Sequence, residues 1–332
     1  MGAMDAVFSG TLFMGASFAL CVMHKLASQR IPLPFTLLAL HTLFIVLVLS
    51  VFRSRLRYGS SQDVRRWVCL APILFTAAAA TGVLAILRAS PGMVVVGLSA
   101  APILTMVVET TFRKGYQISR GTVIALITVV IGSIVHEAHI KLEREALMWT
   151  AAHVVCVAIE RLNQRHLMAN AGIELAKSTM MLLNNGIALA PFVALAVVFE
   201  EHLAWSKHFA ALDGKGAGLL AVSCAFAMVA SYASLRFQHL VSATTQTVLA
   251  NANYFVVVMA AAIVGARTQR PEPAQAVGGA LAILGAGLYL IVRRAVDVHL
   301  TLDASEKDSL TAPTPPGRSP RDSDGSSSDD LA

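Results

Sequence analysis

Residues 175–199 read LAKSTMMLLNNGIALAPFVALAVVF, a nearly continuous apolar run in which Lys177 is the single charged residue. A helix needs roughly 20 mostly apolar residues to cross the hydrocarbon core of a bilayer. This run is therefore long enough to span a membrane. Comparable runs, bounded by turn residues or charges, recur along the chain and predict ten transmembrane helices. The predicted helices cover residues 6–23, 33–52, 67–87, 92–112, 120–136, 147–165, 175–199, 216–235, 242–265 and 274–292.

The composition of the 332-residue chain agrees with an all-α polytopic membrane protein, since 56% of the residues are apolar and 14% are charged. A soluble domain has about 25% charged residues, so the composition disfavours a soluble enzyme or a DNA-binding protein. The net charge of +6 comes from short basic clusters between the apolar runs. Such clusters are typical of cytoplasmic loops and differ from the continuous basic stripe that binds nucleic acid. The four cysteines are isolated, which indicates neither a disulfide framework nor a metal site.

An internal repeat is visible in the spacing of serine and arginine around two apolar runs. Ser90 precedes a run that ends at Arg113, and Ser242 precedes a run of similar length that ends near Arg267. Ten helices in two repeats give five helices each, and an odd number forces the second repeat to insert upside down. Inverted repeats with a binding site between them, near the midplane of the membrane, are a transporter architecture.

The domain organisation follows from this repeat. We expect the first five-helix repeat in residues 1–143, the second in residues 144–294 and a tail in residues 295–332. The tail is rich in Ser, Asp and Pro, a composition that predicts disorder. Lysine and arginine are more frequent in the loops that would lie on the same side as the two termini. The positive-inside rule therefore predicts that both termini, and with them the tail, are cytosolic.

Two groups of amide side chains interrupt the apolar runs and are candidates for substrate binding. Asn184 and Asn185 lie in the middle of the seventh predicted helix, and Gln246, Asn251 and Asn253 lie in the ninth. Amides offer both hydrogen-bond donors and acceptors, which suits the edge of a nucleobase or a sugar hydroxyl. The alternative is that they hold the bundle together by hydrogen bonds between helices. Because the two groups fall in different repeats, we favour a binding cavity.

Two cations near membrane depth are further candidates. Lys177 lies one to two turns before Asn184 and could meet a phosphate as a point charge. Arg88 precedes the Ser90-Pro91 pair and has the same potential. For both residues, snorkelling to the membrane surface is the alternative.

Other intramembrane charges have simpler interpretations. Glu109 and Arg113 are four residues apart on one helical face, so an ion pair within the helix is expected. Glu160 and Arg161 could form a gate or an interfacial ion pair.

The sequence predicts no catalytic site, no cofactor and no metal. His41 and His153 are isolated in apolar runs and are expected to hydrogen-bond a neighbouring helix, with a proton relay as the alternative. No nucleophile elbow, paired carboxylates or zinc-protease helix is found. We therefore predict that the protein is not an enzyme, and an intramembrane enzyme stays open only as a weaker alternative because acidic residues within the runs are few.

Several short motifs resemble the drug/metabolite transporter superfamily, in its nucleotide-sugar and triose-phosphate translocator branch. The resemblance covers about residues 6–294. HK at 24–25 and IPLPF at 31–35 are similar to its Asn-Lys and Phe-Pro-x-Pro stretches. LLNN at 182–185 is similar to the Phe-Tyr-Asn-Asn motif of GDP-mannose transporters, whose asparagines contact the nucleobase. SATT at 242–245 and ANANY at 250–254 are similar to their Ser-x-Thr-Thr and Gly-Ala-Leu-Asn-Lys motifs.

Tyr254 departs from the last of these motifs, because it stands where the family has lysine. A tyrosine hydroxyl can donate a hydrogen bond to a phosphate or sugar oxygen but carries no positive charge at neutral pH. The charge of a diphosphate would then be met elsewhere, and Lys177 and Arg88 are the expected cations. The resemblance supports nucleotide-sugar transport without supporting GDP-mannose as the substrate.

The resemblance implies exchange of a nucleotide sugar for a nucleoside monophosphate by alternating access across a Golgi or endoplasmic reticulum membrane. It allows a homodimer, and it implies no partner beyond these small molecules and the lipid bilayer. The alternatives are a phosphate or organic-anion translocator of the same superfamily, a chaperone-like membrane protein without transport, and the intramembrane enzyme.

Overall fold

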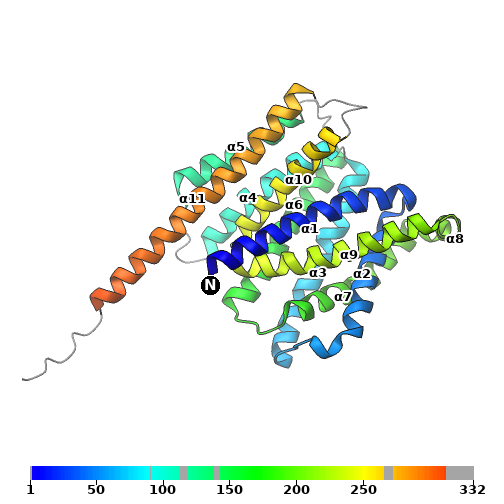
Figure 1. Cartoon of the computed structure of the whole chain (residues 1–332), viewed down its shortest axis with the longest axis horizontal. Coiled ribbons are helices and arrows are strands. Elements are labelled where there is room, and N and C mark those ends of the chain that lie inside the picture. Colours follow the sequence, from blue (N-terminus) through cyan, green and yellow to red (C-terminus); the bar gives the residue numbers. More distant parts are fainter. Residues whose placement is uncertain (1, 90, 113–117, 138–142, 265–271, 312–332) are drawn as a thin grey trace, which may run out of the picture. The chain divides into compact units, whose positions relative to one another are not determined.

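The computed structural model describes residues 2–89, 91–112, 118–137, 143–264 and 272–311. Within these residues the chain is all α, with eleven α-helices and no strand (Figure 1). Each predicted apolar run coincides with a helix or lies almost wholly inside one, and the additional helix, α8, is a short one in a connection. The helices are α1 (Gly2–Arg30), α2 (Pro34–Val51), α3 (Ser61–Arg88), α4 (Pro91–Phe112), α5 (Arg120–His136), α6 (Arg144–Arg165), α7 (Lys177–Val198), α8 (Trp205–Ala210), α9 (Gly214–Leu240), α10 (Ala243–Val264) and α11 (Pro273–Thr311).

Seven of the described helices are long and apolar enough to cross a membrane, namely α1, α2, α3, α4, α7, α9 and α11. Helix α5 is apolar but has only 17 residues. Helix α6 is not among the seven, and charged residues occupy both of its ends. The chain is therefore a polytopic helical membrane protein with seven candidate spans, whereas the sequence predicts ten.

Local sequence signals explain where several helices begin. The hydroxyl of Ser60 accepts a hydrogen bond from the backbone N–H of Asp63 at 3.1 Å, and the Asp63 side chain completes a capping box at the start of α3. Ser119 and Asp213 cap α5 and α9 in the same way. Pro34 opens α2, where its missing N–H leaves no donor unsatisfied. These side chains satisfy N–H groups that lack partners within the helix.

The helices of residues 1–292 pack in a set of antiparallel and crossed pairs around several apolar clusters. The most extensive pairs are α1 with α9, α3 with α6, α2 with α7 and α4 with α6, and further contacts join α3 to α7, α4 to α10, α2 to α9 and α1 to α10. Figure 1 shows α1 and α9 running side by side, with α4, α6 and α10 next to them. One of the larger apolar clusters lies between α2, α3, α7 and α9 and contains the fully buried Trp67 and Met180.

Helices α5 and α11 approach each other at glycines. A Cβ atom added to Gly278 would overlap the backbone nitrogen of His136, and one added to Gly285 would lie 2.8 Å from the backbone nitrogen of Val129. On the facing helix, a Cβ at Gly132 would overlap the backbone nitrogen of Ala282. Close approach of two backbones through small residues is typical of helix packing in membranes. Gly278 and Gly285 of α11 therefore serve helix packing against α5.

The last helix differs from the expected tail. The chain divides into two compact units, Met1–Val292 and Arg293–Ala332. The sequence predicts disorder from residue 295, but α11 remains helical to Thr311. This stretch contains no proline or glycine before Pro313, so nothing in it interrupts a helix that has already formed. The remainder of the tail, residues 312–332, and the repeat markers Ser90, Arg113 and Arg267 lie outside the described residues.

Candidate functional site

The two asparagines of α7 are both buried, and one of them bonds to another helix. Asn184 accepts a hydrogen bond through Oδ1 from the indole N–H of Trp67 on α3 at 2.9 Å. Asn185 donates from Nδ2 to the carbonyl of Met181, one turn earlier in its own helix, at 2.8 Å. Asn184 thus joins α7 to α3, as expected if it stabilises the bundle. This bond uses the oxygen of the amide and leaves its two N–H donors for other partners.

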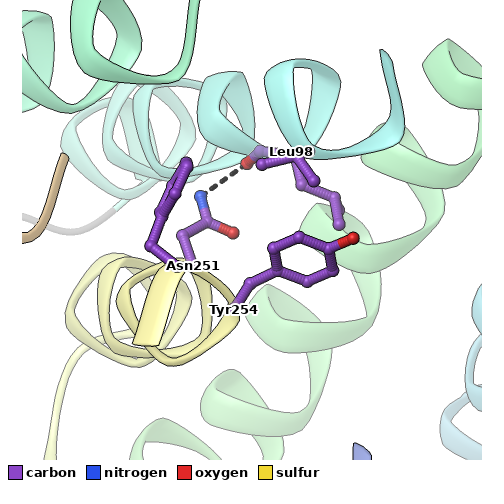
Figure 2. A pocket seen from close by; sticks show the side chains of 5 residues that line it. Leu98, Asn251 and Tyr254 are labelled. Carbon is purple, nitrogen blue, oxygen red and sulfur yellow. Dashed lines mark hydrogen bonds between the residues drawn. The ribbon is translucent and has the colours of Figure 1, made fainter. Parts of the chain in front are cut away.

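Asn251 and Tyr254 of α10 line one small pocket (Figure 2). Asn251 donates from Nδ2 to the carbonyl of Leu98 on α4 at 2.7 Å, and Val95 and Phe255 complete the lining. The cavity has a volume of about 10 Å³, room for about one water molecule, whereas a typical ligand pocket has about 300–1,000 Å³. The structure therefore brings these two predicted residues together around a space much smaller than a nucleotide sugar.

Asn253 faces a different neighbour from Asn251. With its amide oriented so that both polar atoms are paired, Asn253 donates to the carbonyl of Met14 at 3.3 Å and accepts from the N–H of Phe18 at 3.2 Å. Both partners belong to α1. Helix α10 therefore presents its predicted amides to different helices, with Asn251 directed to α4 and Asn253 to α1.

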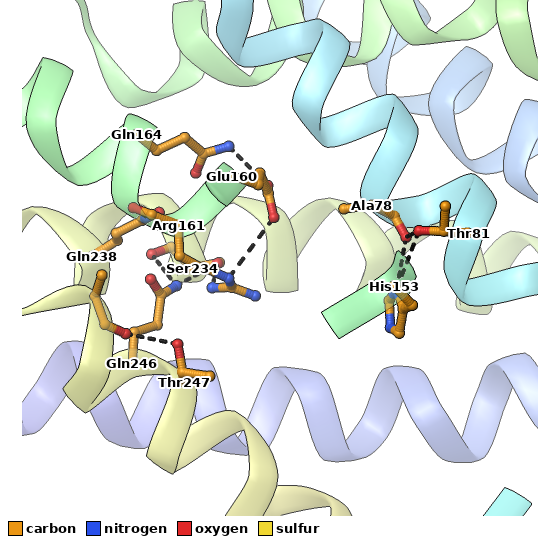
Figure 3. A network of polar contacts seen from close by, with 11 residues as sticks. Ala78, Thr81, His153, Glu160, Arg161, Gln164, Ser234, Gln238, Gln246 and Thr247 are labelled. Carbon is orange, nitrogen blue, oxygen red and sulfur yellow. Dashed lines mark hydrogen bonds and ion pairs between the residues drawn. The ribbon is translucent and has the colours of Figure 1, made fainter. Parts of the chain in front are cut away.

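Gln246 belongs to a buried polar group that we call the Arg161 cluster. Its members come from α6, α9 and α10 and are Glu160, Arg161, Gln164, Ser234, Gln238 and Gln246 (Figure 3). The hydroxyl of Ser234 connects two of the helices, since it accepts from Nη1 of Arg161 at 3.2 Å and from Nε2 of Gln246 at 2.9 Å. Gln238 donates from Nε2 to the backbone carbonyl of Arg161 at 2.7 Å.

The Arg161 side chain has one acidic neighbour within the described residues, Glu160. The distance from Arg161 Nε to Glu160 Oε2 is 3.9 Å, which is an ion pair without a hydrogen bond. Glu160 instead accepts a hydrogen bond from Nε2 of Gln164 at 2.8 Å. The sequence predicted that Glu160 and Arg161 form either a gate or an interfacial ion pair. The structure places the pair in a buried network, where charges are rare and costly in a membrane protein.

A second group of cations lies where α6 and α9 end and α7 begins. Arg165 donates to the carbonyls of Gln238, at 3.1 Å, and His239 at the end of α9. Lys177 Nζ contacts the sulfur of Met168 at 3.6 Å. Lys177 and Arg165 are close enough for their positive charges to repel each other, and His239 lies near both. This part of the bundle therefore contains two neighbouring basic side chains, Arg165 and Lys177.

The structure does not bring Lys177 and Arg88 together. The N–H of Ala176 donates to the carbonyl of Arg57 at 3.2 Å, so α7 begins beside the start of α3. Arg88 is the last residue of α3, whose 28 residues extend about 40 Å. There Arg88 Nη1 pairs with Glu145 Oε1 at 2.9 Å, and both side chains are about half exposed. Lys177 and Arg88 therefore lie near opposite ends of α3, and the basic residue beside Lys177 is Arg165, one helical turn after Arg161.

The two isolated histidines bond to neighbouring helices, as the sequence predicts. His41 Nε2 of α2 is 2.9 Å from the hydroxyl of Ser223 on α9. His153 Nδ1 of α6 is 3.0 Å from the carbonyl of Ala78 on α3.

Two buried glutamates form contacts that the sequence did not predict. Glu109 accepts through Oε1 from the N–H of Ala243 at 2.9 Å, and through Oε2 from the N–H and hydroxyl of Thr244 at 3.2 and 2.6 Å. Glu201 accepts in the same pattern from Phe35 and Thr36, at 3.0, 2.7 and 2.7 Å. Each carboxylate therefore binds the start of a distant helix. The intrahelical pair expected for Glu109 involves Arg113, which lies outside the described residues.

Sequence reasoning also missed Ser234 and Gln238 of the Arg161 cluster. A signal was present, because Ser234, Gln238 and Gln246 flank the break between two apolar runs and would share one end of the bundle. Among the described residues, no group of three His, Cys, Asp or Glu side chains could hold a metal ion.

Comparison with known proteins finds a similar transporter and a solved structure with a similar fold. No family model matches the sequence. GDP-fucose transporter 1 of Arabidopsis thaliana is 27% identical over 198 residues, which are 57% of this chain and 57% of that protein. The aligned part thus spans little more than half of this relative. A solved crystal structure aligns with a TM-score of 0.61 at 17% identity and covers 87% of this chain and 98% of that chain, a likeness that shows the fold alone.

The fold and the Arg161 cluster define a polytopic helical membrane protein with a buried network of polar and charged side chains. This protein is a distant homologue of GDP-fucose transporter 1. The homology confirms the predicted resemblance to nucleotide-sugar transporters.

Proposed function

We propose that this protein is a nucleotide-sugar transporter that exchanges a nucleotide sugar for a nucleoside monophosphate by alternating access. The observation that carries the proposal is the homology to GDP-fucose transporter 1. The positive region formed by Arg161, Arg165 and Lys177 supports it, because a nucleotide is an anion that needs cationic partners. A homologous transporter and a site without a catalytic constellation argue against an enzyme.

The proposal includes ten spans in two inverted repeats, residues 1–143 and 144–294. Leaving out the short α8, the first five helices would correspond to α6, α7, α9, α10 and α11. If each helix is replaced by its counterpart in the other repeat, every one of the following pairs of packed helices becomes an observed pair. The pair α1–α9 becomes α6–α3, the pair α4–α6 becomes α10–α1, and the pair α3–α7 becomes α9–α2. The pairs α2–α7 and α4–α10 become themselves. This symmetry of contacts is what a twofold repeat would produce.

The proposed site joins the Arg161 cluster to the amides of α10, with Asn184 and Asn185 as further contacts for the base. Tyr254 and Asn251 would be further contacts for the sugar. Arg88 is not part of this site, because it pairs with Glu145 at the other end of α3. We place the protein in a Golgi or endoplasmic reticulum membrane with both termini cytosolic, and we leave a homodimer open.

Exchange in proteoliposomes tests this function. Purified protein would be reconstituted in vesicles preloaded with one nucleoside monophosphate, and uptake of each labelled nucleotide sugar would be measured. We expect one nucleotide sugar, or a few that share a base, to enter only when the matching monophosphate is inside. Uptake of inorganic phosphate or sugar phosphates in place of nucleotide sugars would contradict the proposal and favour the organic-anion translocator. No uptake of any of these substrates above protein-free vesicles would also contradict it.

A further inference from the structure

The Arg161 cluster contains polar atoms without partners among the described residues. Nε of Arg161, Oε1 of Gln238 and Oε1 of Gln246 are buried and make no hydrogen bond there. The side chains of both glutamines have no measurable exposure. A buried polar atom without a hydrogen bond is unfavourable, so such atoms call for a specific explanation. Three of them in one cluster, one a donor and two acceptors, indicate a site that a ligand completes.

The orientation of the two amides is fixed by their other hydrogen bonds. Nε2 of Gln238 donates to the carbonyl of Arg161, and Nε2 of Gln246 donates to the carbonyl of Ser234 at 3.3 Å as well as to its hydroxyl. A backbone carbonyl can only accept, so the nitrogen of each amide must face it. The two Oε1 atoms are therefore genuine acceptors that remain unused. They cannot be paired by exchanging oxygen and nitrogen.

Arg161 is held loosely enough to bind an anion. One N–H group of Arg161 donates to the hydroxyl of Ser234. Oε2 of Glu160 is 3.9 Å from Nε of Arg161, which is too far for a hydrogen bond. A guanidinium has five donors in a planar fork that matches the oxygens of a phosphate. Its side chain is 18% exposed, so the site is buried but not sealed. Arg165 follows one turn later on the same face of α6 and, with Lys177, places further positive charge toward the end of the bundle.

The chemistry of the unused atoms defines the ligand. A cationic donor selects an anionic oxygen, whereas the two amide oxygens select groups that donate, such as a hydroxyl. A phosphate bonded to a hydroxylated sugar combines both features within a few ångströms. Inorganic phosphate would satisfy Arg161 but offers less to two acceptors, and an unphosphorylated sugar would leave the guanidinium without its anion.

We propose that Arg161 binds a phosphate group of the transported nucleotide while Gln246 and Gln238 accept hydrogen bonds from the adjoining sugar. This assignment rests on the proposed function and adds to it a particular cation, on α6. It supplies the positive charge that Tyr254 cannot provide on α10. Glu160 then keeps Arg161 in place when the site is empty and yields it to the stronger, hydrogen-bonded phosphate.

Binding measurements on the purified full-length protein test the assignment. Affinities for nucleoside monophosphates and for the matching unphosphorylated nucleosides would be measured by equilibrium binding in detergent. Arg161→Gln is expected to weaken monophosphate binding at least about tenfold, because it removes charge-assisted hydrogen bonds. Nucleoside binding should stay within about twofold of the wild type. Arg144→Gln is the matched control, since Arg144 is exposed at the start of the same helix, about 25 Å away.

Two further variants guard against a folding defect. Arg161→Lys keeps the positive charge but loses the planar, forked arrangement of N–H donors. It should therefore recover part of the monophosphate preference that Arg161→Gln loses. Gln246→Glu keeps the shape and places a negative charge beside the site, so it should also lower monophosphate affinity more than nucleoside affinity. Thermal unfolding without ligand identifies variants that fold. Equal loss of both ligands in folded variants, or an unchanged monophosphate preference in Arg161→Gln, would overturn the assignment.

A phosphate panel separates failure of this assignment from failure of the proposed function. If the wild type transports no nucleotide sugar but binds a sugar phosphate or inorganic phosphate, and Arg161→Gln abolishes that binding, the phosphate site stands and the nucleotide-sugar function fails. If nucleotide sugars are exchanged with an unchanged rate and affinity by Arg161→Gln, the function stands and the assignment fails. A wild type that binds no phosphorylated probe overturns both.

Discussion

The Oε2 atom of Glu109 lies 2.6 Å from the hydroxyl oxygen of Thr244, and this hydrogen bond joins the end of α4 to the start of α10. Glu201 has the same relationship to Thr36 and joins the segment after α7 to the start of α2. The first N–H groups of a helix have no partners within it. In both places a buried carboxylate from another helix provides the acceptor, and the negative charge also interacts favourably with the positive end of the helix dipole.

Glu109→Gln should destabilise the protein. Glutamine can accept with its one oxygen but not at both positions, and it carries no charge. Each lost hydrogen bond to a charged group costs about 1.5–3 kcal/mol. We expect a clear fall in the midpoint of thermal unfolding in detergent. Glu145→Gln is the control, because Glu145 forms a half-exposed pair with Arg88 that contributes about 0–1 kcal/mol. Equal effects of the two changes would contradict the structural role of Glu109.

The bond between Trp67 and Asn184 can be tested by a double-mutant cycle. Trp67→Phe removes the indole donor, and Asn184→Ala removes the acceptor. If the bond stabilises the bundle, each change should cost about 1–3 kcal/mol and the double variant should cost less than their sum. Unfolding in denaturant measures the free energies. Strictly additive losses would show that the two side chains are not coupled.

The same variants separate packing from binding at Asn184. Its N–H donors remain for a ligand when Trp67 is changed to Phe. We therefore expect Asn184→Ala to lower exchange activity more than Trp67→Phe does, per correctly folded protein in vesicles. Equal activity losses that parallel the stability losses would assign Asn184 to packing alone.

Glycine substitutions in α11 provide a matched pair. Gly278→Ala would place a Cβ against the backbone nitrogen of His136, which cannot move out of the way, and should destabilise the protein severely. Gly287 has no atom within 4 Å of an added Cβ. Gly287→Ala should therefore be neutral or stabilise by up to about 1 kcal/mol, since alanine is the better helix former. Expression level and thermal unfolding of both variants check this expectation, and similar behaviour of the two would contradict the observed helix contact.

Lys177→Gln should weaken binding of a nucleoside monophosphate by removing a positive charge next to Arg165. The effect should be strongest at low salt, because exposed parts of the site are screened as ionic strength rises. Competition binding at two salt concentrations measures it. Lys207→Gln serves as the control, since Lys207 is exposed on the short helix α8. An equal effect of the two substitutions would indicate that only net charge matters.

The sequence predicted the helices well because each helix of a membrane protein needs a long apolar run, which is visible in the sequence. The ten runs coincide with helices because a backbone in hydrocarbon must satisfy its own hydrogen bonds. The sequence did not predict that α3 extends to Ser61, where the capping box of Ser60 and Asp63 begins it before the apolar run. The short helix α8 was missed because it lacks an apolar run of its own.

The candidate site was predicted less completely, because its contacts join distant parts of the chain. The amides of α7 and α10 were found as polar residues in apolar runs, but the partner of Asn184 is Trp67, which no local pattern identifies. Arg161 was noticed only as the neighbour of Glu160. Its connection to Ser234 and Gln246 depends on how three helices pack. The sequence also did not show that Lys177 and Arg88 lie near opposite ends of α3, because this depends on how α7 packs against α3.

The glycine contacts between α5 and α11 limit how the molecule can change shape. Side-chain interfaces can slide because rotamers rearrange, but at Gly132, Gly278 and Gly285 the facing atoms belong largely to the backbone. A backbone has no alternative rotamer, so a sliding motion would force main-chain atoms into each other. Up to Val292 these two helices should therefore move together as one rigid unit in the proposed transport cycle. The displacement that admits and releases a ligand must then be taken up by the other helices of the bundle.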